Sequence, residues 1–285
     1  MRLSRRSNNL MRLGVGVTLL FIYVPLFIVA LYAFNGGITL KWPPEHLTTH
    51  WFGVAVNDPG VKDAVLTTAK VGLASTAIAL LLGTLASLAV ARHRFFGRET
   101  ISFLVILPIA LPGIVTGVAL SNTFTQVLGI PLSLFTVVVG HATFCIVVVY
   151  NNVIARLRRV SGSLEEASAD LGADPWQTFR FVTLPNMQTA LVAGALLAFA
   201  LSFDEIIVTL FTIGAGQETL PIWIYSNFFR PNQIPVVNVV AVLALLISIV
   251  PVYLAYRLTR EEGGATGRGA APETTSGIAA TRGAL

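Results

Sequence analysis

The chain has 285 residues, of which 54% are hydrophobic and only 12% are charged, and its mean hydropathy is +0.75. Ordinary soluble domains are far less apolar, so the composition indicates a polytopic membrane protein. The formal net charge is +5, but the basic residues lie at the ends of apolar stretches and form no single patch, which indicates membrane topology and argues against nucleic-acid binding.

Six apolar stretches are long enough to cross a hydrocarbon core, which needs about 20 residues in a helix. They span residues 11–34, 64–91, 101–127, 132–155, 189–213 and 236–258. The first is longer than the roughly 7–15 residues of a signal-peptide apolar region, and no small-residue cleavage site ends it, so we expect a retained helix.

The sequence therefore predicts an all-α polytopic membrane protein with six transmembrane helices. A short segment of residues 1–10 precedes the transmembrane domain of residues 11–260. Residues 261–285 are rich in Gly, Ala, Thr and Ser and have no apolar period, so we expect a disordered tail.

The third stretch carries residues that disturb or tighten a helix, namely Pro108, Pro112, Gly113 and Gly117. Proline removes a backbone hydrogen bond, and glycine allows another helix to approach closely. We expect this helix to be kinked and tightly packed. A place beside a transport path and a purely structural role are equally open alternatives.

Basic residues favour one side of the predicted membrane. Placing the N-terminus in the cytoplasm also places there Arg92, Arg94, Arg98, Arg156, Arg158, Arg159, Arg180, Arg257 and Arg260. Chiefly Lys41, Lys62, Lys70 and Arg230 are left on or toward the other side. Because cytoplasmic loops carry an excess of Lys and Arg, we expect both termini and the loop between the fourth and fifth stretches to be cytoplasmic.

That loop contains a polar, charged segment, residues 163–182, which we call the bracket. Ser163 stands three residues before Glu166, and Asp174 stands three before Gln177. This is the spacing of capping boxes, in which two side chains satisfy the free N–H groups at a helix start. The bracket is therefore predicted to contain two short helices.

Gly172 can end the first helix of the bracket, because glycine adopts the left-handed conformation that closes helices. On that helix Leu164, Ala167, Ser168 and Leu171 recur every three to four residues. They form a small, partly apolar stripe opposite the acidic residues. Such a stripe suits the groove of a partner protein.

The bracket resembles the cytoplasmic signature of the inner-membrane permease subunits of binding-protein-dependent ABC importers. The matching pattern is Glu166-Ala167-Ser168, then Gly172, then Val182, Leu184 and Pro185. Ser168 replaces a usual Ala and Val182 a usual Ile, and both changes are conservative. Any capped helical hairpin in a cytoplasmic loop is the plainer alternative.

The resemblance implies a type I ABC importer permease in the bacterial inner membrane. Its partners are a second homologous permease, two copies of a cytoplasmic ATPase and an extracytoplasmic solute-binding protein. ATPase coupling is then expected at Glu165, Glu166, Ala167, Ser168, Gly172, Ala173, Leu184 and Pro185. Trp176, Phe179 and a Leu184-Pro185 turn are expected to connect the bracket to the fifth helix.

The chain lacks the motifs of an enzyme. It has no Gly-x-x-x-x-Gly-Lys-Ser/Thr motif, and its lysines lie outside Gly-rich loops, so we expect ATP and Mg²⁺ to be bound by the partner ATPase. No catalytic residue, cofactor site or metal site is predicted in this chain. The single cysteine, Cys145, lies in an apolar stretch. His141 is predicted to be a hydrogen-bonded packing residue.

The fifth stretch contains Ser202, Asp204 and Glu205, which we expect to contribute to a substrate path. A charged group in mid-helix costs about 2.5–3.5 kcal/mol on insertion, so it should face water or a partner charge. Carboxylates on an apolar route attract cations. A position near the outer interface, or a hydrogen bond to another helix, is the alternative.

The C-terminal part is similar to the C-type permeases of spermidine/putrescine importers. The similar segments are Ser202 to Val208, Thr219-Leu220-Pro221, Arg230-Pro231 and Pro235 to Asn238. This resemblance implies a polyamine substrate. Ferric iron, sulfate, molybdate and small organic anions remain alternatives within the class. An ion-coupled secondary transporter leaves the bracket unexplained, and a structural scaffold has no positive support in the sequence.

Overall fold

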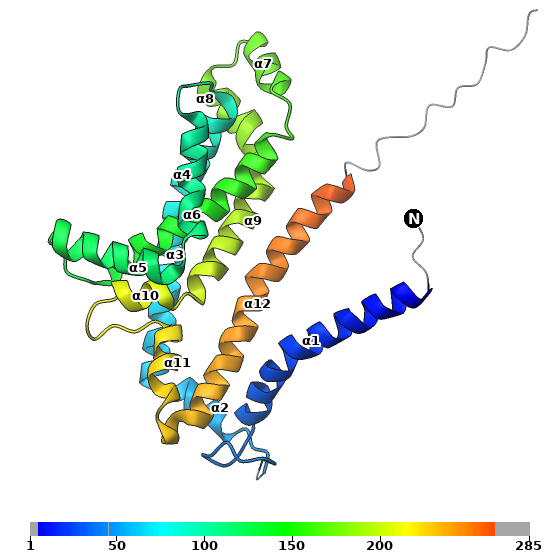
Figure 1. Ribbon diagram of the computed structural model, residues 1–285. Helices are drawn as coiled ribbons and strands as arrows, with labels where there is room; N and C mark the ends of the chain where they lie inside the picture. The colour runs from blue at the N-terminus through cyan, green and yellow to red at the C-terminus, as the bar shows by residue number, and fades with distance from the viewer. Residues whose placement is uncertain (1–4, 45, 266–285) are drawn as a thin grey trace, which may run out of the picture.

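The computed structural model describes residues 5–44 and 46–265, with side chains to residue 258. This part of the chain folds into helices and loops with no named strand (Figure 1). The α-helices are α1 (Arg5–Ala33), α2 (His50–Asn57), α3 (Pro59–Arg92), α4 (Arg98–Ala110), α5 (Gly113–Asn122), α6 (Leu134–Leu157), α7 (Ser163–Asp170), α8 (Pro175–Thr178), α9 (Leu184–Phe203), α10 (Ile207–Thr212), α11 (Leu220–Phe228) and α12 (Ile234–Ala265). Three short helical turns join them: η1 (Thr123–Val127), η2 (Phe179–Thr183) and η3 (Pro231–Gln233).

Five helical segments are long and apolar enough to cross a membrane, and a bent pair makes a sixth. The predicted all-helical class with six spans is thereby confirmed. α12 continues to Ala265, into the segment 261–285 that was predicted to be a disordered tail. The rest of that predicted tail, residues 266–285, lies outside the described residues, as do residues 1–4.

The third span is sharply bent, as its prolines predicted. α4 and the segment Gly113–Val127 meet at 105°, and Leu111 and Pro112 between them are not helical. Pro112 cannot donate the hydrogen bond that a continuous helix needs. After the bend α5 crosses α10 (Figure 1). The approach is close, since a Cβ at Gly117 would lie 2.9 Å from the ring of Phe211.

The centre of the bundle is formed by α3, α6 and α9. Small and hydroxyl-bearing residues let these helices approach each other, as is usual in membranes. The Ser75 hydroxyl donates to the carbonyl of Val138 at 3.0 Å, and the Ser87 hydroxyl donates to that of Tyr150 at 3.1 Å. A Cβ at Gly83 would lie 3.0 Å from the carbonyl oxygen of Ile146. These contacts hold together the three helices that support the bracket and the predicted substrate-path residues 202–205.

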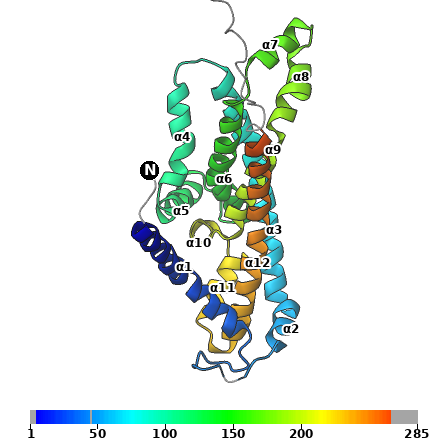
Figure 2. The same cartoon turned by 90° about the vertical axis from the view of Figure 1, so that its right-hand side faces the viewer.

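α1 contacts α12 near one end and then extends away from the bundle (Figure 2). Its most apolar window is not buried by the rest of the described chain. Because apolar residues surround this helix, lipid or another membrane subunit must cover it.

The fifth span is not one continuous helix, so the prediction for residues 189–213 was wrong at its centre. α9 ends at Phe203 and α10 begins at Ile207. Glu205 explains the interruption, because its Oε1 accepts a hydrogen bond from the N–H of Val208 at 2.8 Å. The carboxylate thus caps a new helix start, where a negative charge is favoured.

The bracket lies at the end of the bundle opposite α2 and α11 (Figure 1). The predicted Leu184-Pro185 turn was wrong, since both residues lie in the first turn of α9. α8, η2 and α9 form one helical run from Pro175 to Phe203. Pro185 fits because η2 is π-helical, with the N–H of Leu184 bonded to the carbonyl of Phe179, and a widened turn relieves the clash of the proline ring.

Candidate functional site

The first helix of the bracket closes at Gly172, as predicted. Gly172 has a φ of +85°, and its N–H donates to the carbonyl of Ala169 at 2.9 Å. The N–H of Ala173 reaches back to the carbonyl of Ser168 at 3.1 Å. This pair of bonds is a Schellman motif, which needs a residue that tolerates positive φ. Gly172 therefore sets the direction in which the chain leaves α7.

One of the two predicted capping boxes is present. Asp174 accepts from the N–H of Gln177, and the Gln177 side chain accepts from the N–H of Asp174, both at 2.9 Å. The predicted box at Ser163 was wrong, because Ser163 is already the first residue of α7. Ser161, two residues earlier, takes the capping role, since its hydroxyl accepts from the N–H of Ser163 at 3.2 Å.

The bracket presents exposed apolar side chains at its tip. Leu171 is 89% exposed and Trp176 is 65% exposed, and Leu164 and Ala167 are also exposed. Ser168, the other member of the predicted stripe, is half-buried, and its hydroxyl lies 3.0 Å from that of Thr178. The stripe is therefore divided. Its apolar members form an outer surface suited to a partner, whereas Ser168 joins the two bracket helices.

Glu165 links the bracket to the bundle, a contact that the sequence did not reveal. Its Oε1 lies 2.9 Å from a guanidinium nitrogen of Arg92, at the end of α3, and accepts a hydrogen bond from the Thr183 hydroxyl at 2.9 Å. Glu166 is exposed. Of the two acidic residues expected to serve coupling, Glu165 thus anchors the bracket within the subunit and Glu166 faces outward.

Loss of the Arg92–Glu165 ion pair is expected to loosen the bracket. The two side chains are 21% and 24% exposed, so the pair should contribute about 1 kcal/mol. We expect Glu165→Gln to accelerate amide hydrogen exchange in residues 163–170 by about fivefold without changing α6. Glu166→Gln is the matched control and should leave exchange unchanged. Equal acceleration in both variants would contradict an anchoring role for Glu165.

The second candidate site lies at the break between α9 and α10. Asp204 is exposed and lines a pocket of about 320 Å³ next to Phe203. The other lining residues are Leu220, Pro221, Ile224, Ala244, Leu245 and Ser248. Asp204 is the only ionisable residue of the pocket, and apart from Ser248 the other lining residues are apolar. Such a site favours a ligand with a cationic group.

Ser202 and Glu205 do not line this pocket, and each forms hydrogen bonds elsewhere. Ser202 is 2% exposed, and its hydroxyl lies 2.7 Å from Nδ1 of His141. Glu205 caps α10 through Val208. Of the three residues expected on the substrate path, the structure places only Asp204 in the pocket.

His141 connects the two sides of the break, and its prediction as a hydrogen-bonded packing residue is confirmed. It is 1% exposed, and its Nε2 lies 2.8 Å from the Thr209 hydroxyl. Since Nδ1 meets Ser202, the imidazole joins the last turn of α9 to α10. The ring thereby holds the intervening loop, including Asp204, in a fixed position.

Removing the His141 side chain is expected to destabilise the fold locally. In His141→Ala the hydroxyls of Ser202 and Thr209 each lose a buried partner, and one such group costs about 1–3 kcal/mol. We expect a lower midpoint of thermal unfolding in detergent, partly restored in His141→Gln, which can keep one bond. His93→Ala, at an exposed position, is the control. An unchanged midpoint in His141→Ala would show that the two bonds contribute little.

The described residues contain no group of three or more His, Cys, Asp or Glu that could hold a metal ion. Cys145 is buried, and its thiol donates to the carbonyl of Ala198 at 3.3 Å. The two sites thus offer an exposed apolar surface at the bracket and a carboxylate at Asp204.

Solved structures with the same fold are membrane transporters. The chain superposes on a subunit of a bacterial ABC transporter involved in the import of alginate with a TM-score of 0.67 and 18% identity, covering 92% of this chain and 99% of that one. It superposes on a chain of the MetNI methionine ABC transporter in inward-facing conformations with a TM-score of 0.57 and 21% identity, covering 75% and 99%. The fold is thus that of an ABC transporter membrane subunit.

Sequence comparison gives the family. Residues 79–261 match the family of inner membrane components of binding-protein-dependent transport systems, and the chain belongs to it. The putrescine transport system permease protein PotI of Escherichia coli K12 is 32% identical over 250 residues, which cover 85% of this chain and 88% of that protein. The spermidine/putrescine transport system permease protein PotC of the same strain is 31% identical over 243 residues, covering 85% and 90%.

Proposed function

We propose that this chain is a permease subunit of an ATP-driven importer that passes putrescine or spermidine across the inner membrane by alternating access. The substrate assignment rests on the Asp204 carboxylate, which lies in a largely apolar pocket at a helix break. Polyamines are flexible cations with apolar methylene segments, and both parts find a counterpart there. The relatives that transport putrescine and spermidine support the same substrate class.

The bracket supports the proposed partners. Its exposed Leu171 and Trp176 form an apolar surface at one end of the bundle. Gly172 closes the first bracket helix, α7, and Asp174 caps the start of the second, α8. Such a rigid projection can transmit force from a cytoplasmic ATPase, which would bind ATP and Mg²⁺. A second permease subunit would complete the path, and an extracytoplasmic solute-binding protein would deliver the polyamine.

The proposed orientation follows from charge. Arginines concentrate at the bracket end of the bundle, including Arg92, Arg156 and Arg159. The positive-inside rule places that end in the cytoplasm, together with both termini. The pocket at Asp204 then lies between the bracket and the extracytoplasmic end.

The test is uptake of labelled putrescine and spermidine into liposomes that contain this subunit with its partner permease, ATPase and binding protein. We expect uptake that stops without ATP and continues when ion gradients are collapsed. Uptake that follows an ion gradient without ATP would indicate a secondary transporter. ATP hydrolysis stimulated by the binding protein without polyamine uptake would keep the importer class and reject the substrate, and ferric iron and sulfate would then be tried.

A further inference from the structure

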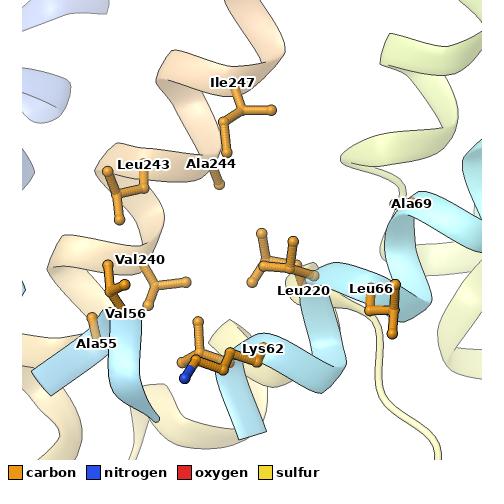
Figure 3. A pocket seen from close by; sticks show the side chains of 12 residues that line it. Ala55, Val56, Lys62, Leu66, Ala69, Leu220, Val240, Leu243, Ala244 and Ile247 are labelled. Carbon is orange, nitrogen blue, oxygen red and sulfur yellow. The ribbon is translucent and has the colours of Figure 1, made fainter. Parts of the chain in front are cut away.

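A second pocket opens between α3 and α12 (Figure 3). It lies toward the end of the bundle opposite the bracket, where both helices start (Figure 1). Its volume is about 360 Å³. Lys62 is the only polar residue among those that line it. α2 contributes Ala55 and Val56, and the buried Leu220 of α11 lies between the two long helices. We call this pocket the Lys62 groove.

The walls of the Lys62 groove are formed by packed helices. The α12 residues Val240, Leu243, Ala244 and Ile247 recur at helical spacing, so one face of α12 borders the groove over about two turns. Leu220 is held in place because its N–H donates to the Thr68 hydroxyl of α3 at 2.7 Å. The wall of the groove is therefore fixed by a hydrogen bond between two helices.

The groove runs along the membrane-spanning helices. α3 and α12 both start at this end of the bundle (Figure 1), and both are long and apolar enough to cross a membrane. From Lys62 to Ala69 the groove follows α3 for seven residues, or about 10 Å at the rise of an α-helix. Lys62 thus marks its outer mouth, and Ala69 and Ile247 lie deeper.

The chemistry of this groove selects an elongated apolar ligand with an anionic group at one end. An apolar wall within the membrane gives water no hydrogen-bond partners, whereas a hydrocarbon chain fills it favourably. Lys62 is exposed, and no ion pair joins it to a carboxylate among the described residues. Neighbouring Asp58 caps α3 through Val61, and Asp63 does not line the groove.

We propose that the Lys62 groove binds a phospholipid of the leaflet opposite the bracket. One acyl chain lies against α3 and α12, and the phosphate meets the Lys62 ammonium. Lysine suits this place because its methylene stem packs on apolar surface while its charge reaches the headgroup level. The site would join the ends of α2, α3, α11 and α12 through a bound lipid. It does not depend on which solute the protein transports.

The experiment counts phospholipids retained by the assembled importer in native mass spectrometry, after release from nanodiscs of phosphatidylglycerol and phosphatidylethanolamine. Lys62→Leu is expected to retain its lipid about fivefold less well, because a lysine near the membrane surface attracts an anionic group by about 1 kcal/mol. Ala69→Phe should fill the groove and abolish retention, and Ala69 does not line the Asp204 pocket. Lys70→Leu, on the same helix but outside the groove, should retain the lipid fully.

Two results would overturn this proposal. One is equal lipid retention in the unaltered protein, Lys62→Leu and Ala69→Phe. The other is efficient crosslinking of Leu66→Cys to a helix of the partner permease, since a protein segment would then occupy the groove in place of the lipid. Normal ATP-driven uptake by all variants shows that they are folded, so a loss of lipid is not mistaken for misfolding.

Discussion

Replacing Gly172 with valine is expected to uncouple ATP hydrolysis from uptake while the subunit remains folded and inserted. Gly172 has a φ of +85°, a conformation that costs a residue with a Cβ about 1–2 kcal/mol. No atom lies within 4 Å of a Cβ built there, so the strain is local and does not reach the bundle. The exit of α7 must then change, and the exposed Leu171 beside it moves relative to the ATPase.

We expect the rate of ATP-driven uptake by Gly172→Val to fall about tenfold, because a backbone strain of about 1–2 kcal/mol corresponds to roughly that factor. Binding-protein-stimulated ATP hydrolysis should be far less affected. Gly97→Val is the matched control, because Gly97 also has a φ of +85° and no neighbour within 4 Å but lies before α4, outside the bracket. Gly172→Asn should be milder, since asparagine tolerates this conformation. Normal coupling in Gly172→Val would exclude a force-transmitting role for this turn.

Asp204→Asn is expected to reduce polyamine uptake by about 10- to 100-fold. The change keeps the size of the side chain and removes the only charge in its pocket. A charge-assisted hydrogen bond contributes about 1.5–3 kcal/mol, which corresponds to that loss. The measurement is the rate of putrescine and spermidine uptake with saturating binding protein, together with the stimulated ATPase rate.

Glu205→Gln is the matched control for Asp204→Asn. Glu205 accepts from the N–H of Val208, and glutamine retains an oxygen that can accept the same bond, so uptake should change little. An equal loss in both variants would indicate damage to the helix break and not loss of a cation contact. Unchanged uptake in Asp204→Asn would reject Asp204 as a substrate contact and leave the family assignment intact.

Features that depend on contiguous residues could be predicted from the sequence. The six spans followed from runs of apolar residues, because crossing a bilayer requires a minimum helix length. The bend at Pro112 and the end of α7 at Gly172 followed from the backbone limits of single residues. The capping box at Asp174 followed from a three-residue spacing. For the same reason the bracket could be recognised, since its signature is local.

Features that depend on packing between distant segments required the tertiary structure. The contact of Glu165 with Arg92, the His141 bonds to Ser202 and Thr209, and the Lys62 groove all join residues far apart in the chain. The break at Asp204 escaped prediction because its apolar flanks continue the helical pattern, while a hydrogen bond from Val208 to Glu205 starts a new helix. The sequence by itself thus determined the membrane class, the spans and the bracket, whose physics is local. Only the tertiary structure decided which polar side chains serve the fold and which reach a pocket, because that depends on the helix faces that meet.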